Sequence, residues 1–300
     1  MESPKSSPNR ISARSRAKVN LALQVLRKRN DGYHEIETIY QSVNLYDELD
    51  LDFRRDGKII ITSDDPDIPN GADNLCHRAV VQMRQVAGGD LGARIHLKKR
   101  IPHSAGLGGG SSNAAAVILG VNASLGLSLS TSELEELALG IGSDVPFMIH
   151  GGTMFARGRG EKLIKLEKIK KCCFLIVKPS VDISTKWVYD NISFRLTRPR
   201  YRFNLKRVNT ILTRFPEVTF SFRNDLENVV CPAYPQISGV LDQLLALNPR
   251  LAAMSGSGSA LFAIFDDEAK ASGIAERFSM MGCFTAVVEP SPRAVELYPT

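Results

Sequence analysis

The sequence lacks any apolar run long enough to cross a bilayer. A spanning helix needs about 20 consecutive apolar residues, whereas the best candidate, residues 114–129, is interrupted by Asn122 and several serines. The N-terminal residues are polar, without the apolar middle region of a secretory signal. We therefore expect no membrane partner and a disordered tail over residues 1–15. Its serines and arginines leave a remnant of an organelle-targeting peptide as the alternative.

The cysteines do not have the spacing of a disulfide framework or a zinc site. There are five, an odd number, and no two of them form a C-x-x-C pair. Cys172 and Cys173 are adjacent within an apolar stretch. This pattern indicates reduced, buried thiols, so we expect a cytoplasmic protein and can assign no metal ligand.

Acidic residues are outnumbered by basic ones, which gives a formal net charge of +6. A positive balance suits anionic partners such as nucleotides, phosphorylated metabolites or nucleic acid. Two clusters carry part of the excess, residues 98–100 and residues 195–202. Each is either a solvated basic surface or part of a binding site, and the role of the second cluster stays open.

The order of the expected elements favours an α+β protein of two domains, because strands and helices are mixed without steady alternation. Strands over residues 16–26 and 33–40 flank an Asn30-Asp31-Gly32 turn, which predicts a β-hairpin. Further along, a basic loop is expected over residues 162–171. A change of composition near residues 155–172 places the domains at 16–160 and 161–300.

The glycine-rich segment from Pro102 to Ser112 predicts a phosphate-binding loop. Glycines let the backbone approach an anion closely, and the unpaired N–H groups at the start of the following helix favour negative charge. Ser111 and Ser112 add hydroxyls for phosphate oxygens or for magnesium. The segment matches neither the Walker nor the dinucleotide pattern. The alternative is a flexible linker or a helix-entry turn.

Phosphoryl transfer also needs a cation and a group that accepts the proton of the attacking hydroxyl. Lys18 lies between apolar residues of a predicted strand, and Asp144 lies in a turn after a predicted helix. Each has an ordinary alternative, an edge-strand lysine with its head in water and a turn or capping aspartate. A second glycine cluster, Met254–Ala260, is either a tight turn or a cover over nucleotide phosphates.

Five blocks together resemble the GHMP small-molecule kinases, in the family's order and over most of the chain. The blocks are residues 17–21, 29–34, 102–112, 142–146 and 254–258. Ser104 stands where the family usually has glycine and Ser257 where threonine is common, so we expect altered loop stiffness with phosphate binding retained. The segment 224–227 also resembles a family element, although we can assign it no role.

The resemblance implies a two-domain GHMP kinase fold. An N-terminal domain like ribosomal protein S5 domain 2 would pack against a C-terminal ferredoxin-like domain, with the active site in the cleft between them. The Gly32-Tyr33-His34 block resembles the corresponding block in those GHMP kinases that act in the non-mevalonate isoprenoid pathway. This resemblance implies transfer of the γ-phosphoryl group of ATP, with Mg2+, to the 2-hydroxyl of a methylerythritol that carries cytidine diphosphate.

The same resemblance assigns roles to particular residues. Asp144 would be the general base, and Lys18 would neutralise charge on the transferred group and hold Asp144. Asn20 and Thr185 would contact the methylerythritol or phosphate groups. The ATP-binding residues would be Pro102, His103, Ser104, Ala105, Gly106, Leu107, Gly108, Gly109, Gly110, Ser111 and Ser112.

At the cytidine end, the resemblance implies that Tyr33 and Tyr189 form two faces of a stacking slot while His34 reads the cytosine edge. The alternatives are a hairpin residue for Tyr33 and a core aromatic beside Trp187 for Tyr189.

Two rival functions remain, a related kinase acting on homoserine, mevalonate or a sugar, and a basic nucleic-acid-binding module without catalysis. We expect a small-molecule substrate, no nucleic acid, and a monomer or weak homodimer.

Overall fold

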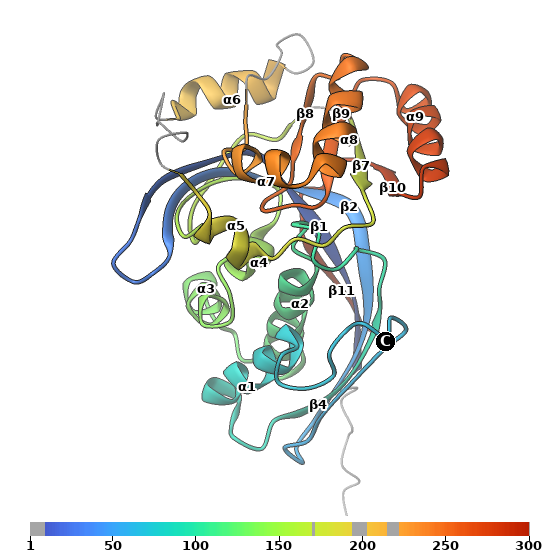
Figure 1. Ribbon diagram of the computed structural model, residues 1–300. Helices are drawn as coiled ribbons and strands as arrows, with labels where there is room; N and C mark the ends of the chain where they lie inside the picture. The colour runs from blue at the N-terminus through green and yellow to red at the C-terminus, as the bar shows by residue number, and fades with distance from the viewer. Residues whose placement is uncertain (1–9, 170–171, 194–202, 215–221, 300) are drawn as a thin grey trace, which may run out of the picture.

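The computed structural model describes residues 10–169, 172–193, 203–214 and 222–299. Within them the chain forms two β-sheets, and each sheet is covered by its own group of helices (Figure 1). This arrangement confirms the α+β prediction. The basic cluster at 195–202 lies outside the described residues.

The first sheet is seven-stranded and is built on the long antiparallel hairpin of β1 and β2. Its path is β11-β1-β2-β4-β3, while β5 pairs with the first half of β2 and β6 pairs with β5. The hairpin turn lies at Asn30-Asp31-Gly32, as predicted, and Gly32 adopts a φ of 85°. The strands are β1 (Arg10–Lys28), β2 (His34–Arg54), β3 (Ile59–Ser63), β4 (Gly92–Lys98), β5 (Thr153–Gly158), β6 (Lys162–Lys165) and β11 (Val295–Pro299).

This sheet corrects three expectations. Residues 10–15 are not a disordered tail, because they pair with β2 on one side and, from Ile11, with β11 on the other. Residues 162–165 form strand β6 instead of a loop, because they pair with β5 in an antiparallel ladder. The sheets change between Lys165 and Cys173, later than residue 160, and β11 returns to the first sheet from the far end of the sequence.

Four helices pack on one face of the first sheet (Figure 1). They are α1 (Leu75–Ala87), α2 (Gly109–Ser124), α3 (Thr131–Leu139) and α4 (Val145–His150). A capping box at Ser130 and Glu133 starts α3. Helix α2 is lined by small residues and is buried over most of its length, which brings its N-terminal turn close to the sheet.

The second sheet has four antiparallel strands in the order β10-β7-β9-β8. One of its faces packs on α5, α7, α8 and α9. The elements are β7 (Cys173–Lys178), α5 (Thr185–Asp190), α6 (Leu205–Arg214), α7 (Glu227–Ala233), α8 (Pro235–Ala246), β8 (Leu251–Met254), β9 (Leu261–Phe265), α9 (Glu268–Met280) and β10 (Phe284–Val288).

The other face of the second sheet packs directly on the β1–β2 hairpin. Val19 and Leu21 of β1 lie in one apolar cluster with Phe174 of β7 and Phe262 of β9. Because successive side chains of a strand point to opposite faces, Lys18 and Asn20 point away from this cluster. In the part of the chain that the structure describes, no helix has the length and apolar character that a bilayer span requires.

Candidate active site

A cavity of about 870 Å³ lies where the glycine-rich loop meets the β1–β2 hairpin. Its walls come from β1, β2, the 102–111 loop, the start of α4, α5 and the turn between β8 and β9. The predicted site residues that line it are Lys18, Asn20, Tyr33, His34, Pro102–Ser111, Asp144, Thr185 and Tyr189. Ser112 does not line it, because its side chain is fully buried in the protein interior.

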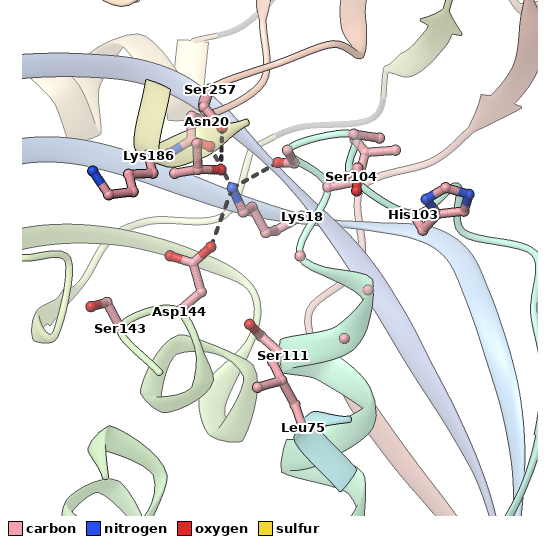
Figure 2. A pocket seen from close by; sticks show the side chains of 18 of the residues that line it. Lys18, Asn20, Leu75, His103, Ser104, Ser111, Ser143, Asp144, Lys186 and Ser257 are labelled. Atoms are coloured by element: carbon pink, nitrogen blue, oxygen red, sulfur yellow. Dashed lines mark hydrogen bonds and ion pairs between the residues drawn. The ribbon is translucent and has the colours of Figure 1, made fainter. Parts of the chain in front are cut away.

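Lys18 is buried at the centre of this site, with only 3% of its surface exposed. Its Nζ donates to Asn20 Oδ1 at 2.7 Å and to the Gly106 carbonyl at 2.8 Å, and lies 3.6 Å from Asp144 Oδ2 (Figure 2). Burial lowers the pKa of Lys18, and the carboxylate of Asp144 opposes that shift. The alternative of a solvated edge lysine is therefore excluded.

Asp144 directly precedes α4, yet its side chain makes no capping bond to that helix. Instead, Asp144 Oδ1 accepts a hydrogen bond of 2.9 Å from the hydroxyl of Tyr40 on β2. The side chain keeps 32% of its surface exposed, toward the cavity. The capping alternative is excluded too, and the carboxylate lies between a buried cation and open space.

The glycine-rich loop has a backbone that side chains would obstruct. Gly106 and Gly108 adopt φ values of 73° and 71°, in the left-handed region. A Cβ on Gly106 would lie 2.0 Å from the Ser255 carbonyl oxygen. Ser104 also adopts a positive φ, 51°, so the serine keeps a glycine-like conformation at a cost of roughly 1–2 kcal/mol.

The second glycine cluster joins β8 to β9 as a turn and also contacts the first glycine loop. Ser255 Oγ donates to the Gly106 carbonyl at 2.9 Å, and the backbone N–H of Ala260 donates to the Ala105 carbonyl at 3.1 Å. Ser257 Oγ lies 2.8 Å from Thr185 Oγ1 of α5. The cluster is therefore a tight turn that also holds the first glycine loop, while its contact with nucleotide phosphates stays a prediction.

The segment 224–227 holds that second glycine cluster in place. Asn224 Nδ2 donates to the carbonyls of Met254 and Gly256, at 2.8 and 2.7 Å. Glu227 Oε1 accepts from the Met254 N–H at 2.7 Å. The backbone of Asn224 also pairs with Leu23 of β1. These contacts run between segments about 30 and 200 residues apart in sequence, which is why the sequence could suggest no role.

Aromatic side chains gather at the far end of the cavity. The rings of His34 and Tyr189 lie 5.2 Å apart between centroids, and Arg159 Cζ lies 4.5 Å from the centroid of Tyr33. Tyr33 is 52% exposed. Burial, and next the charge of Lys28, lower the pKa of His34, which favours its neutral form. The structure thus brings Tyr33, His34 and Tyr189 to one cavity, while their stacking on a base stays a prediction.

The sequence interpretation missed Tyr40 and Arg159. Tyr40 is one of several aromatic or apolar residues of β2, and nothing in its spacing distinguishes it. Arg159 did carry a signal in the sequence, because it stands between two glycines, Gly158 and Gly160. In the structure these glycines adopt positive φ values of 77° and 110°.

The described residues contain no group of three or more His, Cys, Asp or Glu side chains placed to hold a metal ion. Ser111, in the first turn of α2, and Asp144 supply oxygens to the same cavity (Figure 2). Such a site fits Mg2+, which usually binds to nucleotide phosphates with only one or two protein oxygens.

Comparison with known proteins supplies the family. The sequence model of the GHMP kinases N terminal domain matches residues 74–152, and that of the GHMP kinases C terminal domain matches residues 204–281. A homoserine kinase structure from Cytophaga hutchinsonii, with 18% identity and a TM-score of 0.70, shares the fold over 99% of this chain.

Nearer relatives narrow the assignment. The 4-diphosphocytidyl-2-C-methyl-D-erythritol kinase of Syntrophotalea carbinolica is 40% identical over 275 residues, 91% of this chain and 96% of that protein. The kinase of the same name from Geobacter sulfurreducens is 37% identical over 279 residues, 93% of this chain and 98% of that protein. A crystal structure of 4-(cytidine 5'-diphospho)-2C-methyl-D-erythritol kinase has a TM-score of 0.80 and 31% identity, and covers 93% of this chain and 99% of that one. The chain therefore belongs to the 4-diphosphocytidyl-2-C-methyl-D-erythritol kinases of the GHMP kinase family.

Proposed function

We propose that this kinase transfers the γ-phosphoryl group of ATP to the 2-hydroxyl of 4-diphosphocytidyl-2-C-methyl-D-erythritol, with Asp144 as general base. The observation that carries the role of Asp144 is its position. The carboxylate faces the cavity, 3.6 Å from a buried lysine and across from the glycine loop. A positioned base of this kind contributes roughly 10²–10⁴-fold to the rate.

Lys18 acts as the cation of the site. Its ammonium is held by Asn20 and the Gly106 carbonyl, so it is already oriented before substrates bind. A fixed positive charge in a water-poor site stabilises the charge that develops on the transferred group. Because the Gly106 carbonyl binds Lys18, the phosphate loop and the cation keep one relative position.

The glycine loop would bind the phosphates of ATP through its backbone N–H groups and the Ser111 hydroxyl. Mg2+ would neutralise charge on the phosphates, and Ser111 and Asp144 are the residues that would hold it. Asn20 and Thr185 would orient the acceptor, because both line the cavity beside the Lys18–Asp144 pair.

The cytidine group would occupy the aromatic end of the cavity. Tyr33 and Tyr189 would stack on the base, with about 1–3 kcal/mol for each stacked contact, and His34 would read the cytosine edge. A homoserine or mevalonate kinase needs no such aromatic end. A monomer or weak homodimer in the cytoplasm remains our expectation, and the five free cysteines support a reducing compartment.

The proposal is tested by ADP release with ATP and magnesium. We expect release with the cytidine substrate and none with homoserine or mevalonate. Asp144→Asn should lower kcat by at least 100-fold, whereas Asp90→Asn, a matched change at an exposed carboxylate beside Arg55, should not. Full activity of Asp144→Asn would overturn the assignment of the base, and release with homoserine alone would overturn that of the substrate.

A further inference from the structure

The hydroxyl of Tyr40 is an unassigned polar group in contact with the reacting carboxylate. Tyr40 lies on β2 directly opposite Asn20 of β1, and only 1% of its surface is exposed. Its hydroxyl donates to Asp144 Oδ1 at 2.9 Å. Hydrogen bonds from a hydroxyl to an ionised carboxylate are among the stronger ones in proteins.

The surroundings of Tyr40 leave its hydroxyl little freedom. The ring packs on Phe147 of α4 with 4.7 Å between centroids. Gly160 lies so close that a Cβ there would approach the Tyr40 hydroxyl to 2.4 Å. The hydroxyl is therefore fixed by packing on two sides, and Asp144 must adopt the orientation that meets it.

The Tyr40 hydroxyl remains a donor at every working pH. Burial, followed by the charge of Asp144, raises the pKa of Tyr40 well above its ordinary value. The phenol therefore keeps its proton and does not itself act as an acid or base.

The two oxygens of Asp144 thus face different partners. Tyr40 occupies Oδ1, and Lys18 lies 3.6 Å from Oδ2. We propose that Tyr40 is a positioning residue that fixes the orientation of Asp144, so that Oδ2 stays directed to Lys18 and the acceptor hydroxyl. This inference rests on the proposed role of Asp144 as the base.

The carboxylate of Asp144 is surrounded by groups from several elements. Lys18 of β1 and Tyr40 of β2 contact its carboxylate, and Tyr189 of α5 interacts with it electrostatically. Glu161, in the turn between β5 and β6, acts on Tyr40. Among them Tyr40 donates the hydrogen bond of 2.9 Å to Oδ1, so removing its hydroxyl leaves that oxygen free to rotate.

The test is Tyr40→Phe, which removes one oxygen and keeps the ring. We expect kcat to fall about ten-fold, equivalent to about 1.4 kcal/mol, with the KM of both substrates within about two-fold. Tyr46→Phe is the matched control on the same strand, because Tyr46 contacts Arg14 and Arg100 and does not line the cavity. It should leave kcat and both KM values unchanged.

A double mutant separates positioning from a merely structural role. If Tyr40 acts through Asp144, the Tyr40→Phe/Asp144→Asn protein should be no slower than Asp144→Asn alone. A further ten-fold loss in the double mutant, or an unchanged kcat in Tyr40→Phe, would overturn the inference. Full activity of Asp144→Asn would instead show that the base assignment itself has failed.

Discussion

Replacing Gly106 by alanine should disable the phosphate loop through a clash with the backbone. The new Cβ would lie 2.0 Å from the Ser255 carbonyl oxygen, whereas ordinary contacts begin at 3.4 Å. The loop or the β8–β9 turn would therefore have to move by about 1.4 Å. Neither can do so freely, because Ser255 Oγ and Lys18 Nζ both donate to the Gly106 carbonyl.

The size of the effect follows from that displacement. A misplacement of about 1 Å in a phosphoryl-transfer site costs roughly 100-fold in rate. The positive φ adds a cost in stability of roughly 1–2 kcal/mol, which any alanine in this conformation would share. Gly126 offers that control, because it has a φ of 60° and a Cβ added to it would meet nothing within 4 Å.

The assay is kcat/KM for ATP in Gly106→Ala and Gly126→Ala, together with urea unfolding of both. We expect Gly106→Ala to lose roughly 100-fold in kcat/KM, while Gly126→Ala stays within two-fold of the parent protein. Both should be destabilised by about 1 kcal/mol or more. If the two variants had the same kcat/KM, the clash would not control the loop and this reasoning would be refuted.

Two further changes test the site and its support. Lys18→Met should lower kcat by roughly 100-fold, because the site loses its fixed cation. It should also lower the free energy of unfolding by about 1–3 kcal/mol, because Asn20 Oδ1 loses its donor. An unaltered kcat would contradict the role of the cation. Burial raises the pKa of Glu227 to about 7, so the folded protein holds this proton more tightly than the unfolded chain, and stability should fall as pH rises from about 4 to about 7. The measurement is the free energy of unfolding in urea at pH 5 and at pH 7.5. Glu227→Gln should reduce the difference between the two values by up to about 3 kcal/mol. If the parent protein and the variant showed the same difference, Glu227 would be ruled out as its source.

Local sequence signals predicted the parts of the fold that depend on nearby residues. The turn at Asn30–Gly32 and the glycine loop both combine residues a few positions apart. Strand β6 was missed because its four residues carry little apolar pattern and become a strand only by pairing with β5. The early start of β1 was missed for the same reason, since its first residues are mostly polar and pair with β2 and β11.

The candidate site shows the same division between local and long-range information. Lys18 and Asp144 could be named from short motifs, but their separation of 3.6 Å depends on how β1 and α4 pack. Tyr40 could not be found from its own surroundings in the sequence, because its hydroxyl meets Asp144 104 positions later in the chain. Ser112 was assigned to the phosphate site from its neighbour, yet in the first turns of a helix adjacent residues point in different directions, and Ser112 points inward.

The alternation of β1 ties the chemistry of the site to the packing of the two sheets. Val19 and Leu21 bury the interface with the second sheet, and the residues between and before them, Asn20 and Lys18, face the cavity. A shift of one residue in this strand would exchange the two sets and place an ammonium in an apolar core. The register of β1 is irregular between Asn20 and Ala22, directly after the site residues. Beyond that irregularity Leu23 pairs with Asn224, so the segment that holds the second glycine cluster is fixed to the same strand that carries Lys18.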